Sequence, residues 1–132
     1  MAKNRELFDR GLAVRKEVLG AAYVEAALEE ANPFTEDFQT YLTECAWGGV
    51  WARPGLDRKT RSMLTIAMLA ALGQHEELKL HIRATARTGV SREEIKEILL
   101  QAAVYAGVPA ANSAFHQAEA AFQQMEKEAR RP

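Results

Sequence analysis

The sequence has one cysteine, no long hydrophobic run and almost no excess of charge, and each shortage excludes a class of protein. Cys45 alone cannot form a disulfide or a dithiol redox centre within the chain, so a reducing, cytoplasmic location is expected. Seventeen basic and eighteen acidic side chains give a net charge of −1, which predicts no nucleic-acid partner and no membrane partner. The apolar stretch 63–72 is too short to cross a bilayer, and no signal-peptide pattern opens the chain.

Several functional motifs are also missing. The sequence contains no glycine loop for phosphates, no dinucleotide fingerprint and no nucleophile elbow. His75 and His81 are six residues apart, whereas four would place two imidazoles on one helical face, and no His-Glu-x-x-His pattern occurs. The sequence therefore predicts no metal site.

What the chain does contain is helix-forming sequence. Strand signals are nearly absent, while alanine, leucine, glutamate and lysine are plentiful. Ser91 and Glu94 form a capping-box pattern, and Pro109 suits the first turn of a helix. We predict a single domain over residues 1–132, an all-α compact bundle of about six to seven helices. The expected helices cover about residues 4–19, 21–31, 36–47, 58–72, 75–88, 92–106 and 109–128.

Two of these helices carry long apolar stripes. Residues 66–72 are apolar on all sides, which predicts a central buried helix. The last helix repeats alanine and phenylalanine at heptad-like spacing. A chain of this size can bury one of the two stripes in its own core and the other in a subunit interface.

The strongest chemical signal is the pair Glu77 and His81. Residues four apart share one helical face, so the carboxylate can orient the imidazole, which then accepts or delivers a proton near neutral pH. The alternative is a solvated surface pair worth ~0.2–0.5 kcal/mol of helix stability. His75 lies on a different face from His81, and His116 borders the apolar stripe of the last helix. For both, a structural or solvated histidine is the alternative.

A basic and aromatic stretch precedes and opens the expected helix 58–72. Arg53, Arg58, Lys59 and Arg61 are clustered, three of them in a first helical turn, where the helix dipole disfavours cations. An anionic ligand would offset this, since arginine forks suit carboxylates; a solvated basic face is the alternative. Trp47 and Trp51, expected at the rim of a loop, can wall a pocket or pack that loop onto the bundle. Tyr105 can offer its phenol to a ligand or serve the core.

Three blocks of sequence resemble a known family. They are 47–62 (WGGVWARPGLDRKTRS), 75–83 (HEELKLHIR) and 101–112 (QAAVYAGVPAAN). In this order they resemble the carboxymuconolactone decarboxylase family of the alkylhydroperoxidase D-like superfamily. The resemblance implies an all-helical, homo-oligomeric protein, a hexamer in the decarboxylase-like members. Peroxide-reducing relatives carry two cysteines where this chain has Gln74 and Glu77, so dithiol chemistry at that place is excluded.

The resemblance also implies a reaction. The expected substrate is 4-carboxymuconolactone, a lactone dicarboxylate, which loses CO2 and becomes 3-oxoadipate enol-lactone in the protocatechuate branch of the β-ketoadipate pathway. Because the lactone carbonyl accepts the electrons, no cofactor is required. His81, oriented by Glu77, is the expected catalytic residue. The expected substrate-binding residues are Arg53, Arg61, Trp47, Trp51, His75, Tyr105 and His116. Two alternatives are a decarboxylase acting on another lactone and a non-catalytic helical oligomer that binds or scaffolds.

Overall fold

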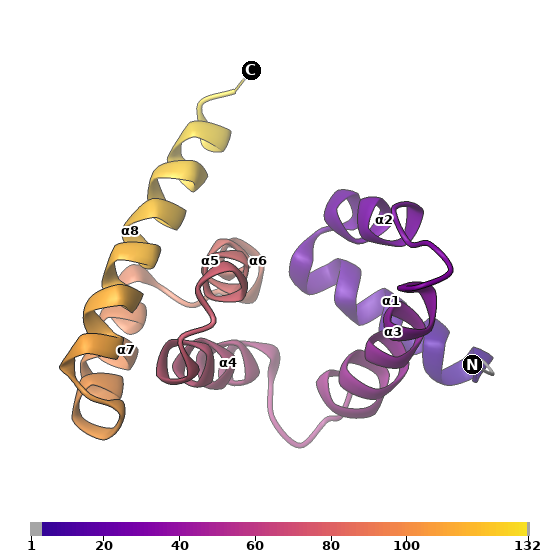
Figure 1. Ribbon diagram of the computed structural model, residues 1–132, viewed down its shortest axis with the longest axis horizontal. Coiled ribbons are helices and arrows are strands. Elements are labelled where there is room, and N and C mark those ends of the chain that lie inside the picture. The colour runs from indigo at the N-terminus through magenta and orange to yellow at the C-terminus, as the bar shows by residue number, and fades with distance from the viewer. Residues whose placement is uncertain (1–3, 132) are drawn as a thin grey trace. The chain divides into compact units, whose positions relative to one another are not determined.

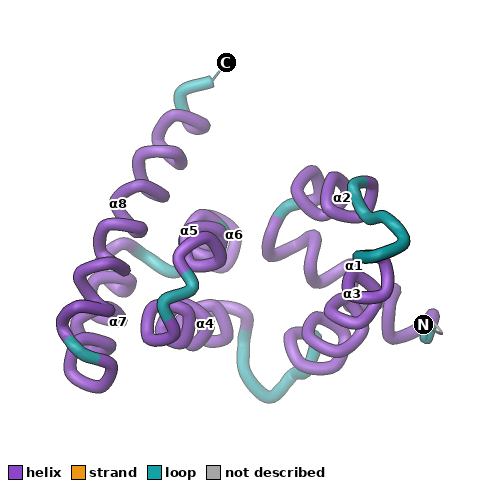
Figure 2. The backbone as a smooth tube through the Cα atoms, viewed as in Figure 1, coloured by secondary structure: helices purple, strands orange, loops and turns teal. Residues whose placement is uncertain are grey.

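The computed structural model describes residues 4–131, and they divide into two compact units, one ending at Asp57 and one beginning at Arg58. The elements within each unit are helices joined by short turns (Figure 1). Figure 2 shows no strand in this part of the chain, so the predicted all-α class is confirmed. Within the same residues, no helix is both long and apolar enough to cross a membrane.

The first unit holds three α-helices and a π-helix. They are α1 (Arg5–Leu19), α2 (Ala21–Glu29), α3 (Glu36–Leu42) and η1 (Thr43–Trp51). The Asn4 side chain caps α1 by accepting a hydrogen bond of 3.1 Å from the Leu7 N–H. Gly20 ends α1 and begins α2 with a φ of 96°, a backbone angle that residues with a Cβ rarely adopt. The two helices are therefore joined through a single residue.

Two glycines let α1 and η1 pack with their backbones in close contact. A Cβ added at Gly11 would overlap the Thr43 carbonyl oxygen and lie 2.7 Å from the Gly48 nitrogen. A Cβ at Gly48 would overlap the Leu7 carbonyl oxygen. Val14, Val18 and Trp47 are buried in this unit. The core of the first unit thus depends on the absence of side-chain atoms at two positions of the contact.

The second unit is built from five helices. They are α4 (Arg58–Leu72), α5 (His75–Arg83), α6 (Thr85–Thr88), α7 (Arg92–Ala106) and α8 (Val108–Ala129). The predicted capping box of Ser91 and Glu94 is confirmed at the start of α7, and Pro109 lies in the first turn of α8 as predicted. Gly89 closes α6 in the left-handed conformation, with φ 85° and ψ 11°.

Helix α8 packs against α5 and α7 and contributes an alanine face to the core. Its buried residues recur at the predicted heptad-like spacing: Ala111, Ala114, Ala118 and Ala121. Leu78 and Ile82 of α5 are fully buried in the same cluster, with Leu99 of α7. Small side chains on α8 let the neighbouring helices approach closely.

Helix α4 differs from the expectation of a helix buried on all sides. Ile66 and Ala70 join the core, but Met68 is 56% exposed and Leu72 is 71% exposed. The prediction that all of 66–72 is buried is therefore wrong for the single chain. An all-round apolar helix has more apolar surface than its three neighbours in this unit can cover.

Two further stretches depart from the predictions. The sequence around Gly48 and Gly49 was expected to end a helix and begin a loop, but the structure continues it as the π-helix η1. The predicted helix 75–88 is interrupted at Ala84 and becomes α5 and α6. Thr35 lies at the start of α3 as expected, yet its hydroxyl accepts from the Asn32 N–H at 3.0 Å and makes no cap to α3.

Candidate active site

Glu77 and His81 lie one helical turn apart on α5. The opposite side of this helix is held in the core by Leu78 and Ile82, both fully buried. This anchoring fixes the rotation of α5, so Glu77 is exposed and His81 is partly buried. The charge of Glu77 acts directly on the imidazole. The predicted pairing of a carboxylate with an imidazole is therefore present in the structure.

The surroundings of His81 favour its neutral form. Burial lowers the pKa of His81 to about 4, and the charge of Glu77 opposes this shift. At neutral pH the imidazole is consequently uncharged and keeps one N–H donor and one acceptor nitrogen. Such a group can donate a hydrogen bond to a developing oxyanion and can take up a proton when an anion approaches it.

The basic start of α4 lies close to the chain that follows His81. The Thr88 hydroxyl of α6 donates a hydrogen bond of 2.9 Å to the Ser62 hydroxyl of α4, and both residues are buried. Arg61 precedes Ser62 and is itself partly buried. The second unit thus places a guanidinium group and the Glu77–His81 helix on elements that pack against each other.

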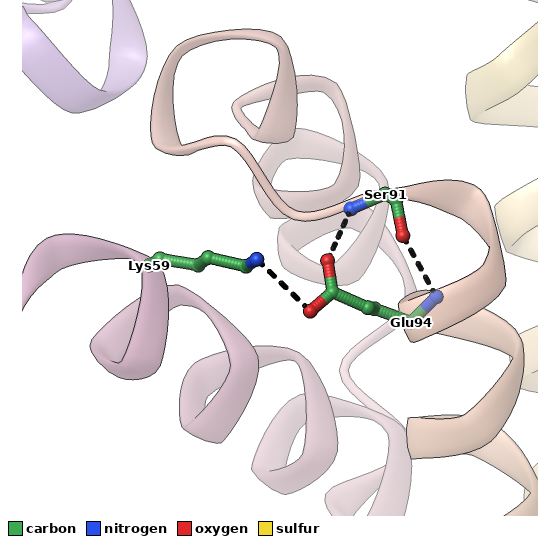
Figure 3. Close-up of polar contacts among 3 residues, drawn as sticks. All are labelled: Lys59, Ser91 and Glu94. Carbon is green, nitrogen blue, oxygen red and sulfur yellow. Dashed lines mark hydrogen bonds and ion pairs between the residues drawn. The ribbon is translucent and has the colours of Figure 1, made fainter.

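Lys59, also in the predicted basic cluster, is held by a helix cap. Its ammonium lies 3.0 Å from a carboxylate oxygen of Glu94, whose other oxygen accepts the Ser91 N–H at 3.0 Å (Figure 3). The pKa of Glu94 is lowered, first by the Ser91 backbone bond and then by Lys59. Lys59 therefore joins the starts of α4 and α7, and its charge is answered within the chain.

The remaining predicted residues are distributed over both units. In the first unit, Trp47 and Trp51 stack with ring centroids 4.8 Å apart and an interplanar angle of 26°, one turn of the π-helix apart instead of at the rim of a loop. Arg53 follows η1 and is exposed. In the second unit, His75 and His116 are exposed, and Tyr105 is 85% exposed.

An apolar groove of about 490 Å³ lies between α4 and α7. Leu64, Met68, Ile98 and Tyr105 are among its lining residues, and no charged side chain lines it. A dicarboxylate needs cationic partners when it leaves water, so this groove does not suit such a ligand. Neither Glu77 nor His81 contributes to it.

Sequence reasoning missed one buried charge. Arg15 of α1 is only 4% exposed and lies on the same helical stripe as Gly11, Val18 and Leu19, which are also buried. The spacing of this stripe could have indicated the burial, because residues three, four and seven apart share a face. A charged residue on an apolar stripe was instead assumed to be solvated.

Comparison with known proteins decides the family. The model of the "Carboxymuconolactone decarboxylase family" matches residues 36–120, which include Glu77, His81 and Arg61. The chain belongs to the carboxymuconolactone decarboxylase family. The resemblance inferred from the three sequence blocks is therefore confirmed.

Two relatives of this family member are similar over most of its length. It is 48% identical over 122 residues to a 4-carboxymuconolactone decarboxylase of Acinetobacter baylyi, covering 92% of this chain and 91% of the relative. It is 53% identical over 106 residues to a nitrosuccinic acid decarboxylase of Metarhizium robertsii, covering 80% and 74%. Both relatives are named as decarboxylases, although their substrates differ.

Proposed function

We propose that the protein is a carboxy-lyase that converts 4-carboxymuconolactone into 3-oxoadipate enol-lactone and CO2, in the protocatechuate branch of the β-ketoadipate pathway. The observation that carries the proposal is the partly buried, neutral His81 with Glu77 one turn away, in a chain that is 48% identical to a 4-carboxymuconolactone decarboxylase over 92% of its length. The proposed location is the cytoplasm, in keeping with the single cysteine.

The proposed reaction uses the substrate as its own electron acceptor. The bond between the ring carbon and the departing carboxylate breaks, and its electron pair moves through the ring double bond into the lactone carbonyl. A dienolate with a negatively charged oxygen results, and a proton then adds to the ring. The protein has to hold the retained carboxylate, stabilise the oxyanion and deliver the proton.

His81 is proposed to serve the oxyanion and the proton transfer. Its neutral imidazole can donate an N–H to the developing oxyanion, with Glu77 orienting the ring. A bound dianion raises the pKa of His81 because a nearby negative charge favours the imidazolium form. The same group can therefore become a proton donor once substrate is present. Arg61, on the helix packed beside α5, is proposed to anchor the retained carboxylate.

The other binding residues stay predictions with the same roles. Trp47 and Trp51 are proposed as apolar walls that keep water from the departing carboxylate, and Arg53 as a second candidate anchor. The exposed His75, Tyr105 and His116 are proposed as contacts of lower rank. In the single chain their exposure leaves them available to a ligand or to another copy of the chain.

Nitrosuccinic acid is the second candidate substrate, because the 53% identical relative is named for it. Its nitro group can accept the electron pair of the breaking bond, as the lactone carbonyl does in the first candidate, and it also retains one carboxylate. The non-catalytic alternative requires a solvated Glu77–His81 pair, which the partial burial of His81 disfavours.

A substrate comparison tests the proposal. Purified protein is given each candidate acid separately, and CO2 release and product formation are followed by gas analysis and ultraviolet absorbance. We expect faster turnover of 4-carboxymuconolactone, and a His81→Ala variant slower by about a hundredfold or more. Turnover of nitrosuccinic acid alone would transfer the assignment to the second candidate, and no CO2 from either would leave the scaffold alternative.

We also propose that the working form is a homo-oligomer, with a hexamer as the expected assembly. The uncharged groove between α4 and α7 supports an apolar partner, and Met68, Val104 and Tyr105 expose large apolar surfaces around it. A patch that provides both a groove and projecting apolar side chains can bind its own copy across a twofold axis. Exposed patches of this kind mark interaction sites in soluble proteins.

A further inference from the structure

Arg15 holds α1 against the helix that contains α3 and η1, and it does so with one nitrogen. Its Nη1 donates to the Gln39 side-chain oxygen at 3.1 Å and to the Thr43 hydroxyl at 3.3 Å. The Thr43 hydroxyl in turn donates to the Gln39 carbonyl at 2.7 Å. Both partners of the guanidinium are neutral, so these bonds leave its positive charge without a matching negative one.

The other edge of the same guanidinium is unused. Nε and Nη2 point to one side and form the two-pronged donor that arginine presents to carboxylates. Among residues 4–131, neither nitrogen has a hydrogen-bond acceptor, and Nε is fully enclosed. The neighbouring cation, Lys16, by contrast lies 3.4 Å from the Glu25 carboxylate. Arg15 is therefore a buried cation that its own described chain does not neutralise.

Such an arrangement is unfavourable unless an anion completes it. Arginine cannot lose its proton in a protein, and a charge taken out of water without a partner destabilises the fold. Burial lowers the pKa of Arg15, and the phenol of Tyr23 opposes that shift, which places Tyr23 near the guanidinium. Tyr23 is 45% exposed, so the protein surface begins beside the unused edge.

We propose that the Nε–Nη2 edge of Arg15, with Tyr23 at its rim, binds the carboxylate of a small organic acid. A carboxylate matches the two parallel N–H groups, and its single charge balances the one cation. The enclosed Nε becomes accessible when the half-exposed Tyr23 side chain moves aside. This site lies within the first unit and does not depend on the Glu77–His81 pair or on the proposed decarboxylation.

A purely structural role for Arg15 makes the opposite prediction for one substitution. If the Gln39 and Thr43 bonds are its whole purpose, Arg15→Met loses them and lowers the unfolding temperature. If the site awaits an anion, the same variant removes an unmatched buried charge, and replacing such a charge by an apolar chain of similar length leaves stability unchanged or raises it. The two roles therefore differ in the sign of the change in acid-free buffer.

The experiment uses the full chain, with succinate as the probe and phosphate at equal ionic strength as the control anion. Unfolding temperature and the fluorescence of Trp47 and Trp51, which lie on the same η1 as Thr43, are followed as succinate is added. Lys16→Met is the matched control, because it removes the adjacent charge at a residue already paired with Glu25. We expect succinate to stabilise the wild type and Lys16→Met, and Arg15→Met to bind at least tenfold more weakly.

Two further variants keep the test decisive if Arg15→Met does not fold. Arg15→Lys keeps the charge but loses the two-pronged donor, so it should also lose most of the succinate response. Tyr23→Phe should weaken binding several-fold. An equal response in wild type and Arg15 variants, or no response in the wild type, overturns the proposal. So does a change in sedimentation mass caused by Arg15→Met, since the carboxylate would then belong to a second copy.

Discussion

The carboxylate of Glu77 determines how far the pKa of His81 falls on burial. Glu77→Gln keeps the size of the side chain but removes the charge that opposes the shift, so the pKa of His81 should fall further. We expect kcat for the proposed substrate to drop by about tenfold, as a weakened proton-transfer group predicts. Steady-state kinetics measure this.

Glu76→Gln is the matched control for that change. Glu76 precedes Glu77, is exposed, and pairs with Lys79 at 3.0 Å instead of with the imidazole. Its loss should leave kcat within about twofold of the wild type, because surface pairs of this kind contribute little. An equal drop in both variants would show that general helix charge, and not the orientation of His81, is responsible.

His81 should also make stability depend on pH. The unfolded chain binds a proton on this histidine below pH ~6.5, whereas the folded chain does so only below about 4. The stabilisation is complete above pH ~6.5 and is lost as pH falls toward 4, with a total of roughly 2–3 kcal/mol. Urea unfolding between pH 4 and 7 at fixed protein concentration measures it. In a His81→Gln variant this part of the slope should vanish; an unchanged slope would refute the assignment.

The sequence alone predicts the pairing at this site but not its environment. A spacing of four residues on a helix brings Glu77 and His81 together whatever surrounds them. The burial of His81 depends on how α5 is rotated by Leu78 and Ile82 against α8, which local sequence does not specify. Arg15 shows the same limit, because an arginine on an apolar stripe is solvated or buried according to the helix packed against it.

At the scale of elements, the contact between α1 and η1 should be intolerant of a single methyl group. Gly11→Ala would force apart two backbones, and we expect a loss of about 1–3 kcal/mol of stability, as for other overpacked contacts. Gly55→Ala is the matched control because a Cβ there meets nothing within 4 Å. Urea denaturation of the two variants compares them. Equal stabilities would mean that the helices separate without strain.

Helix ends were predictable where side chains mark them, and helix types were not. The start of α7 follows from the Ser91–Glu94 capping box, and the start of α8 from Pro109. The π-helix η1 has no comparable signal, since its wider hydrogen-bonding pattern leaves no fixed residue code. Gly48 and Gly49 indicated a helix end by their flexibility, whereas Gly48 instead permits the close approach of α1.

At the scale of the whole molecule, the exposed face of α4 and α7 should control assembly. Met68→Asp places a charge in the uncharged groove, which an apolar interface cannot accommodate without a partner. We expect the variant to sediment as a smaller species than the wild type while keeping its helical circular dichroism. Ala120→Asp, at an exposed position of α8, should assemble normally. Unchanged mass in Met68→Asp would move the interface elsewhere.

The chain divides where its sequence offers a turn. The boundary between the two units follows Pro54 and Gly55 and falls between Asp57 and Arg58. The family match over residues 36–120 continues across this boundary. A single domain over residues 1–132 stays a prediction, because composition shows no linker and the units have separate cores of their own.

The left-handed backbone at Gly89 has a stereochemical consequence. Its φ of 85° and ψ of 11° are the mirror image of ordinary right-handed helical angles, and a Cβ there would meet no neighbouring atom. An L-alanine would be strained at this position, but its enantiomer would fit and would restrict the unfolded chain, adding about 0.4–1 kcal/mol. A semisynthetic protein with D-alanine at residue 89 should therefore outlast the natural chain on heating.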